Sequence, residues 1–339
     1  MKKACCRILL LCLLLLGAHH AKAGEDIAAT KPRYSIGAKV WMSDGESTWS
    51  QNASAISTLL GDPSSKLTYK NLRSNVLEIN GNVELPRQFF LAIAYGKGDI
   101  DDGILTDDDF LSALGADFFG TTVGGQHRFS RTRSDVDGDD LDYVNLTFGR
   151  AIVRSTDQMK GLNLFATYQR WTERYIAQGV EQLTCTAPNV LCQPAGFVGF
   201  VGDNAISNEA KWRSLFVGAD GYLQLNHRVK LHGQLAYTPI ADLSSQDVHF
   251  LRADLRKDPS FSHSGRGTGI NAEIGAEFRI NRNFYATAGI RYWQLKAEDE
   301  SGGFRSNPIG SAPIKAELNE FKTERKGLVL GIVYRPSAH

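Results

Sequence analysis

The chain has 339 residues, of which 42% are hydrophobic and 22% charged, and its 38 Lys and Arg residues nearly balance its 37 Asp and Glu residues. This balance excludes the basic excess that nucleic-acid-binding proteins usually carry. After the N-terminal segment, no apolar run approaches the ~18 residues of a membrane-spanning helix, which excludes a helical membrane protein. A soluble β protein and a membrane β-barrel both remain compatible with the composition.

Residues 1–23 are typical of a secretory signal peptide. A basic start is followed by the apolar stretch 8–18 and by Ala21-Lys22-Ala23, a small-x-small cleavage site. A membrane anchor is the alternative, but the apolar stretch is too short to span a bilayer. We therefore expect cleavage after Ala23 and a single domain over residues 24–339.

Of the 5 cysteines, only Cys185 and Cys192 lie outside this segment. They are close in sequence, and an exported protein meets an oxidising compartment. This favours a disulfide within a small loop over a metal site or a nucleophile. Two cysteines alone also supply too few ligands for a zinc site.

Residues 270–280 alternate between apolar and polar side chains. Even positions are apolar, as at Ile274, and odd positions are polar or glycine, as at Glu273. The stretches 77–85 and 229–238 follow the same pattern. Strands of this length exceed the about five or six residues usual in soluble sheets and are typical of membrane barrels, with lipid outside and a polar lumen inside. A soluble antiparallel sheet with one wet face is the alternative.

About ten such segments occur, an even number as in single-chain bacterial barrels. Tight turns are expected around 86–88, 157–158, 226–227 and 281–283, and long polar connections elsewhere. The fold class is therefore all-β: an antiparallel transmembrane β-barrel in the outer membrane, with periplasmic termini, long extracellular loops and a narrow, filled lumen. The expected strands are 34–42, 67–85, 89–97, 143–153, 162–175, 212–225, 229–238, 269–280, 284–295 and 327–334.

Two short acidic motifs follow the third and the seventh of these segments. Asp107 and Asp109 share a face because a strand has a period of two, and so do Asp247 and His249. Connections after odd-numbered strands emerge at the same rim of a barrel, so we expect both pairs to border one cleft. Three carboxylates and an imidazole can activate a water, with His249 as the base.

These motifs, in this order along the chain, resemble those of the omptin family, which are outer-membrane endopeptidases built as ten-stranded barrels. Residues 65–70 (Ser-Lys-Leu-Thr-Tyr-Lys) are similar to the family's Ser-x-Leu-x-Trp-Lys segment. Residues 103–110 resemble its Gly-x-x-x-Asp-x-Asp-Trp block, and 244–250 resemble the loop with its Asp-x-His-Tyr motif. Residues 34–37 and Gly45-Glu46 resemble its first strand.

The resemblance implies that Asp107 and Asp109 are the catalytic aspartate pair and that Asp247 and His249 form the catalytic dyad. A water then attacks the peptide without a covalent enzyme intermediate, and no metal ion or other cofactor is expected.

Omptins prefer basic residues beside the scissile bond, held by acids in the cleft. Glu46 aligns with one of these substrate-binding acids, whereas Ser245 occupies the position of the other. The resemblance therefore leaves a strict preference for dibasic substrates open.

Omptins also bind lipopolysaccharide on the outer barrel wall. Tyr168, Glu173 and Arg174 resemble part of the pattern that binds it, although with irregular spacing. The partners expected are thus membrane lipid or lipopolysaccharide and a peptide or protein substrate, and the resemblance leaves a requirement for lipopolysaccharide open. A monomer is expected.

Two further readings stay open. The acidic stretch 135–142 has the oxygen-rich composition of a calcium loop but lacks the EF-hand spacing, and a solvated acidic hairpin is the alternative. The chain as a whole has the alternative of a non-enzymatic omptin-like barrel, acting as a small porin or an adhesin.

Overall fold

The computed structural model describes residues 33–121, 127–155, 159–298 and 303–336. The predicted signal peptide, residues 1–23, and the turn expected at 157–158 lie outside the described residues. No helix in the described ranges has the length and apolar character needed to cross a bilayer. The described elements are β1 (Tyr34–Asn52), β2 (Leu60–Glu84), the 3-10 turn η1 (Pro86–Gln88), β3 (Phe89–Leu111), α2 (Ala113–Phe119), β4 (Arg128–Val136), β5 (Asp140–Arg154), β6 (Lys160–Cys185), β7 (Val198–Gln224), β8 (Val229–His249), β9 (Phe261–Arg279), β10 (Phe284–Glu298), β11 (Gly303–Ser306) and β12 (Ile314–Tyr334).

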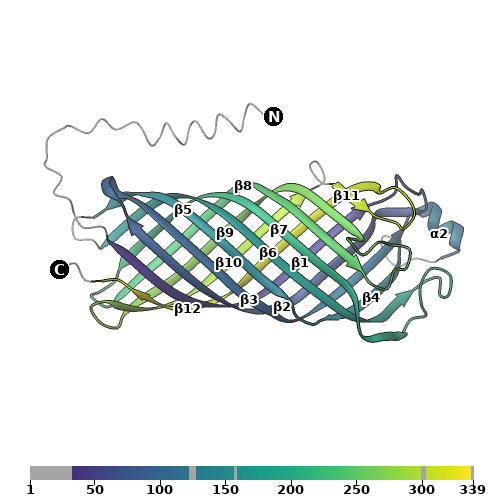
Figure 1. The fold of residues 1–339 in the computed structure, drawn as a ribbon, viewed down its shortest axis with the longest axis horizontal. Helices are drawn as coiled ribbons and strands as arrows, with labels where there is room; N and C mark the ends of the chain where they lie inside the picture. Colours follow the sequence, from purple (N-terminus) through teal and green to yellow (C-terminus); the bar gives the residue numbers. More distant parts are fainter. Residues whose placement is uncertain (1–32, 122–126, 156–158, 299–302, 337–339) are drawn as a thin grey trace, which may run out of the picture. The chain divides into compact units, whose positions relative to one another are not determined.

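The strands form one antiparallel sheet that closes on itself, because β1 pairs with both β2 and β12 (Figure 1). β4 and β5 lie end to end, and both pair with β3 on one side and with β6 on the other. β10 and β11 likewise share the place between β9 and β12. Each of these two pairs occupies a single strand position in the ring, so the 12 described strands make ten positions. The all-β barrel fold and its about ten strands are therefore confirmed.

The two ends of the barrel differ in their connections. Connections 85–88, 225–228 and 280–283 are short turns, as predicted, and lie at the end where β1 begins and β12 finishes. We call this the turn end. The opposite end, the loop end, carries the connections 53–59, 186–197, 250–260 and 307–313 and residues 112–121 after β3.

Most strands continue toward the loop end well beyond the segments predicted from alternation. β3 runs to Leu111 and β8 to His249, whereas the expected strands end at 97 and 238. Both acidic motifs therefore lie in strands, and their predicted location in loops is wrong. The simple alternation is lost there because the outer face of these strand ends is polar as well.

A band of outward apolar side chains surrounds the half of the barrel nearer the turn end. Leu77, Ile79, Leu235 and Ile274 are exposed by 55%, 56%, 63% and 68%. Closer to the loop end, outward positions are polar, as at Asp242. Lipid stabilises such a band, so it marks the membrane-spanning part of the barrel and leaves the loop-end half outside the bilayer.

Side chains fill the lumen between the two halves. Trp171 of β6 stacks on Trp293 of β10 with ring centroids 3.9 Å apart, and on Tyr143 of β5 at 5.0 Å. Trp41 of β1 meets Trp171 edge-on at 6.1 Å. We call these four aromatic residues the Trp plug. It accounts for three of the five tryptophans, and each of its residues is at most 1% exposed.

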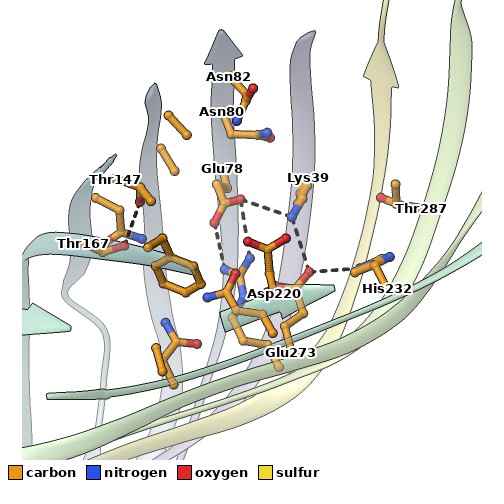
Figure 2. A pocket seen from close by; sticks show the side chains of 18 of the residues that line it. Lys39, Glu78, Asn80, Asn82, Thr147, Thr167, Asp220, His232, Glu273 and Thr287 are labelled. Atoms are coloured by element: carbon orange, nitrogen blue, oxygen red, sulfur yellow. Dashed lines mark hydrogen bonds and ion pairs between the residues drawn. The ribbon is translucent and has the colours of Figure 1, made fainter. Parts of the chain in front are cut away.

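On the turn-end side of the Trp plug lies a polar cavity of about 390 Å³ (Figure 2). Arg291 crosses it to pair with Glu78 and Glu273, each at 2.8 Å. Lys39 lies 3.7 Å from Glu78 and 3.4 Å from Glu273, and His232 lies 3.6 Å from Glu273. Opposite charges on facing strands thus compensate one another inside the membrane-spanning part.

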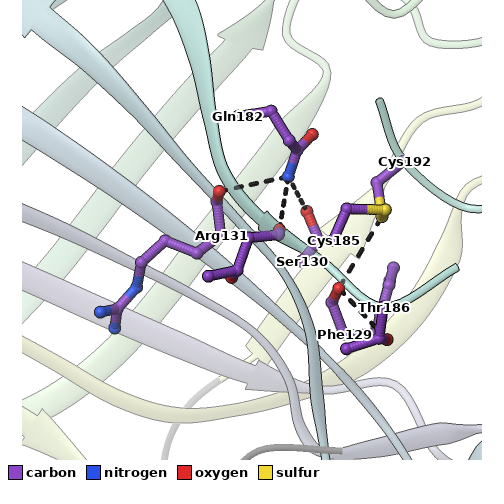
Figure 3. Close-up of a disulfide and its surroundings, with 8 residues drawn as sticks. Phe129, Ser130, Arg131, Gln182, Cys185, Thr186 and Cys192 are labelled. Atoms are coloured by element: carbon purple, nitrogen blue, oxygen red, sulfur yellow. Dashed lines mark hydrogen bonds between the residues drawn. A yellow bond between two sulfur atoms is a disulfide. The ribbon is translucent and has the colours of Figure 1, made fainter. Parts of the chain in front are cut away.

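The predicted disulfide between Cys185 and Cys192 is present and begins the connection 186–197 (Figure 3). The Gln182 amide beside it donates to Ser130 Oγ at 3.0 Å and to the Thr184 carbonyl at 2.8 Å. The first bond joins β6 to β4, and the Thr186 N–H donates to the Phe129 carbonyl at 2.9 Å, which holds the start of the disulfide loop against β4.

The acidic stretch 135–142 is not a hairpin, so that prediction is wrong. β4 and β5 pair with the same two neighbours on either side of residues 137–139. Gly138 has a φ of 67°, which favours glycine and permits a kink between two collinear strands. Among the described residues, no group of three or more His, Cys, Asp or Glu side chains is arranged to hold a metal ion.

Candidate active site

The aspartate pair lies on the inner face of β3 near the loop end. Leu105, two residues before Asp107, is 1% exposed and packs in the core, and Asp107 and Asp109 continue along the same face. Ser65 of β2 donates a hydrogen bond to Asp107 at 3.3 Å. Asp108, between them, is on the outer face, where Arg131 donates to both of its carboxylate oxygens at 2.6 and 2.7 Å.

The Asp-His pair lies on the inner face of β8. Asp247 is 0% exposed, and Ser245, two residues earlier, is 1% exposed. The register sets Asn208 of β7 opposite Asp247, and its side-chain amide donates to Asp247 and, at 3.0 Å, to Ser245 Oγ. The His249 ring meets Phe261 edge-on at 4.7 Å.

Bulges turn these side chains inward. On β3, Tyr95 is exposed on the outer wall, yet Asp107, also at an odd position, faces the lumen. The pairing of β2 with β3 explains this. The neighbours Arg73 and Ser74 of β2 pair with Asp102 and Ile100 of β3, so β3 has one extra residue here, a bulge that reverses its alternation. β8 has an extra residue between Thr238 and Ala241 relative to β9, so its inner face changes in the same way.

Two side chains link the walls. The Tyr69 hydroxyl of β2 interacts electrostatically with both Asp247 and Asp107. Arg252, in connection 250–260, is held by Asp254 through hydrogen bonds of 2.8 and 2.7 Å. Its guanidinium acts on the aspartate pair of β3 and on His249 of β8. The four predicted catalytic residues therefore belong to one electrostatically connected cluster of buried side chains at the loop end, which we call the cleft.

The cleft favours neutral forms of its ionisable groups, and it lies outside the apolar band. Burial raises the pKa of Asp247 to about 8, with the Asn208 hydrogen bond opposing the rise. Burial raises the pKa of Asp109 to about 6, and burial together with the neighbouring Asp109 raises the pKa of Asp107 well above its ordinary range. Burial lowers the pKa of His249 to about 3. Near pH 7, His249 is a free base, and most of Asp247 is protonated.

Glu46 does not lie in the cleft, so its predicted substrate-binding role is wrong. Its neighbours Gly45 and Ser47 are buried, and Glu46 is on the outer wall, 4.0 Å from the exposed Lys70. The extra residue at this point is in β2 and not in β1, so β1 keeps its alternation and Glu46 stays outside. Of the two positions compared with omptin acids, only Ser245 lies in the cleft, and it is uncharged.

The three residues expected to bind lipopolysaccharide do not share a face. Tyr168 is 47% exposed on the outer wall. Arg174 is also outside, paired with Glu209 at 2.6 Å and with Asp140 at 3.6 Å. Glu173 is 0% exposed and pairs with Arg325 inside the barrel. Its place in an outer-wall site is therefore wrong.

Several residues of the cleft carry no signal in the sequence. Asn208 and Tyr69 reach the acidic motifs only through the strand register. His263, buried on β9, lies against Trp49 with the ring centroids 4.4 Å apart and the planes tilted by 48°, and it is opposite Ser245. Only the pairing of neighbouring strands reveals these contacts.

Comparison with solved structures finds a similar fold in the outer membrane protease OmpT from Escherichia coli. The TM-score is 0.72 at 10% sequence identity, and the match covers 93% of this chain and 100% of that one. Ail from Yersinia pestis (TM-score 0.28, 10% identity, 91% and 100% covered) and OprG from Pseudomonas aeruginosa (0.31, 14%, 92% and 100%) also match, with scores too low to support an argument. No family model and no curated protein sequence matches the chain. The resemblance noted in the sequence thus extends to the fold.

Proposed function

We propose that this chain is an outer-membrane endopeptidase that hydrolyses peptide bonds with a water activated by His249. The observation that carries the proposal is the placement of Asp107 and Asp109 on one inner wall and of Asp247 and His249 on another, linked through Tyr69 and Arg252. The apolar band and the similarity in fold to OmpT support the outer membrane as the location. Export through a cleaved signal peptide, residues 1–23, is part of the same proposal.

In the proposed reaction, the water oxygen bonds to the carbonyl carbon while His249 Nε2 takes one of its protons. The carbonyl π electrons move to the carbonyl oxygen, to which protonated Asp107 donates a hydrogen bond. Asp109, and Asp247 as the pH rises through its pKa of about 8, stabilise the imidazolium in their ionised forms. His249 then returns the proton to the amide nitrogen, the C–N bond breaks, and a carboxylic acid and an amine leave.

The test is cleavage of a fluorophore-quencher peptide library by refolded protein in detergent. The library includes basic, acidic and neutral peptides, because Glu46 is outside the cleft and Ser245 is uncharged. Asp247→Asn and His249→Ala are expected to lose about 100-fold or more in rate. Asp242→Asn is the control, since it removes an exposed outer-wall carboxylate from β8, the strand that carries Asp247 and His249, and it is expected to keep the wild-type rate. A cleavage rate that His249→Ala leaves unchanged would overturn the assignment.

A small pore has less support than an enzyme, because the Trp plug crosses the lumen. An adhesin remains the outcome if no peptide is cleaved and no current flows across a planar bilayer.

A contact with lipopolysaccharide is a separate part of the proposal. It would use Tyr168 and Arg174 on the outer wall, without Glu173. Activity measured with and without added lipopolysaccharide, for the wild type and for Tyr168→Ala, tests it. The requirement fails if the wild-type rate is the same under both conditions.

A further inference from the structure

Tyr69 lies directly beneath the two catalytic pairs. It is on the inner face of β2, opposite Leu105 of β3 and Ser47 of β1, and is 0% exposed. Its ring stacks on that of Tyr175 from β6, with centroids 4.9 Å apart. Where the omptin pattern has Trp, this chain thus has a phenol, so the hydroxyl is a feature of its own sequence.

Six buried polar atoms of cleft residues have no hydrogen-bond partner among the described residues: Tyr69 Oη, Asn208 Oδ1, Asp247 Oδ2, His249 Nε2, and Nδ1 and Nε2 of His263. Two atoms beside them are satisfied: the Tyr175 hydroxyl donates to Glu173, and the other oxygen of Asp247 accepts from Asn208. Unpartnered atoms also occur elsewhere in the barrel, as at Trp171 Nε1 and Ser214 Oγ, so Tyr69 Oη, Asp247 Oδ2 and His249 Nε2 are distinguished by their place at the two catalytic pairs.

The three atoms also belong to one neighbourhood. Asp247 and His249 are two residues apart on one strand face. The Tyr69 hydroxyl interacts electrostatically with both Asp247 and Asp107. Its ring stacks on Tyr175, which lies opposite Asn208, the residue that donates to Asp247. Buried polar atoms in proteins are almost always satisfied, and an ordered water with about three partners commonly does this in a polar site.

We infer that the Tyr69 hydroxyl holds the attacking water by donating a hydrogen bond to its oxygen. The inference rests on the proposed function and adds a residue to it. In this arrangement the water accepts from Tyr69, donates one proton to His249 Nε2 and contacts Asp247 Oδ2. Its remaining lone pair attacks the peptide carbonyl. Burial raises the pKa of Tyr69 well above its ordinary value, so the phenol keeps its proton throughout the reaction.

The experiment compares Tyr69→Phe with Tyr175→Phe in peptide cleavage, thermal unfolding and pH profile. Tyr69→Phe removes an oxygen that has no protein partner, so we expect kcat to fall about 100-fold while KM and Tm stay near wild-type values. The profile of kcat/KM against pH is expected to rise near the pKa values of Asp109 and Asp247 in this variant as in the wild type. Tyr175→Phe removes a hydroxyl bonded to Glu173, so Tm falls while kcat changes little.

Each outcome decides the question. A wild type no more active than His249→Ala overturns the proposed function and this role with it. If the wild type cleaves and His249→Ala does not, a Tyr69→Phe rate within about threefold of wild type overturns the role of Tyr69 alone. A Tm loss in Tyr69→Phe as large as in Tyr175→Phe, or a shifted pH profile at full kcat, would reassign Tyr69 to a structural or charge-tuning role.

Discussion

The ion pair between Glu173 and Arg325 offers the sharpest test of the packing beneath the cleft. The two side chains are 1% and 0% exposed and join β6 to β12 across the lumen. Arg325 also donates to Ser43 Oγ at 3.2 Å, to Ser74 Oγ at 3.0 Å and to the Leu72 carbonyl at 3.0 Å. The substitution Glu173→Gln keeps the shape of the side chain and removes its charge.

The expected loss follows from the burial of both partners. Glu173→Gln leaves the Arg325 guanidinium in the interior with neutral partners only, and breaking a buried pair in this way costs about 3–5 kcal/mol. Asp242→Asn is the matched control, since Asp242 pairs with Arg266 at 2.9 Å on the outer wall, where the side chains are 53% and 66% exposed. An exposed pair of this kind contributes about 0–1 kcal/mol.

Urea unfolding in detergent micelles, followed by tryptophan fluorescence, measures both free energies of unfolding. The 5 tryptophans are suitable reporters because each is at most 1% exposed. The double variant Glu173→Gln/Arg325→Met removes the uncompensated charge, and we expect it to recover at least half of the loss. If Glu173→Gln costs no more than Asp242→Asn, or if the double variant is less stable than Glu173→Gln, the reasoning from an uncompensated buried charge is wrong.

Three further predictions concern the cleft and its rim. Because burial raises the pKa of Asp109 to about 6 and of Asp247 to about 8, and ionisation of either stabilises the imidazolium, kcat/KM should rise with pH through both values. The residual activity of Asp247→Asn should lack the upper step, and a flat profile from pH 5 to 9 would contradict the assignment. Asn208→Ala removes the hydrogen bond that lowers the pKa of Asp247, so the upper step should move above pH 8; an unmoved or lowered step would refute this. Replacing Cys185 and Cys192 by Ser should cost about 2–3 kcal/mol, the entropy of closing a short loop, and should speed proteolysis within 186–197; unchanged urea midpoints and cleavage rates would argue otherwise.

The membrane-spanning half of the barrel was predictable because lipid imposes a rule on the sequence. One face of each strand must be apolar and the other can be polar, so alternation as at Ile274 and Glu273 marks the strand and its outward side. The strand ends beyond the band have water outside and a polar cleft inside. No contrast between the faces remains there, and the sequence of β3 past 97 therefore resembles a loop.

The acidic pairs were predictable as pairs but not in orientation. The strand period puts Asp247 and His249 on one face whatever that face is. Which face it is depends on bulges. Counting from the exposed Tyr237 by strict alternation would place Asp247, also at an odd position, on the outer wall. The extra residue between Thr238 and Ala241 reverses this, and it can be seen only in the pairing of β8 with β9.

The same bulges explain why Tyr69 is in the cleft and Glu46 is outside it. Gly45 and Ser47 of β1 pair with Leu72 and Tyr69 of β2. One residue separates the pair in β1 and two residues separate the pair in β2. The extra residue lies in β2, so β2 changes its inner face and directs Tyr69 toward the aspartates, whereas β1 keeps its alternation and directs Glu46 outward. A motif comparison along the chain aligns residue types but cannot count extra residues between strands. Bulges at the loop-end edge of the apolar band therefore decide which side chains of this barrel face the candidate active site.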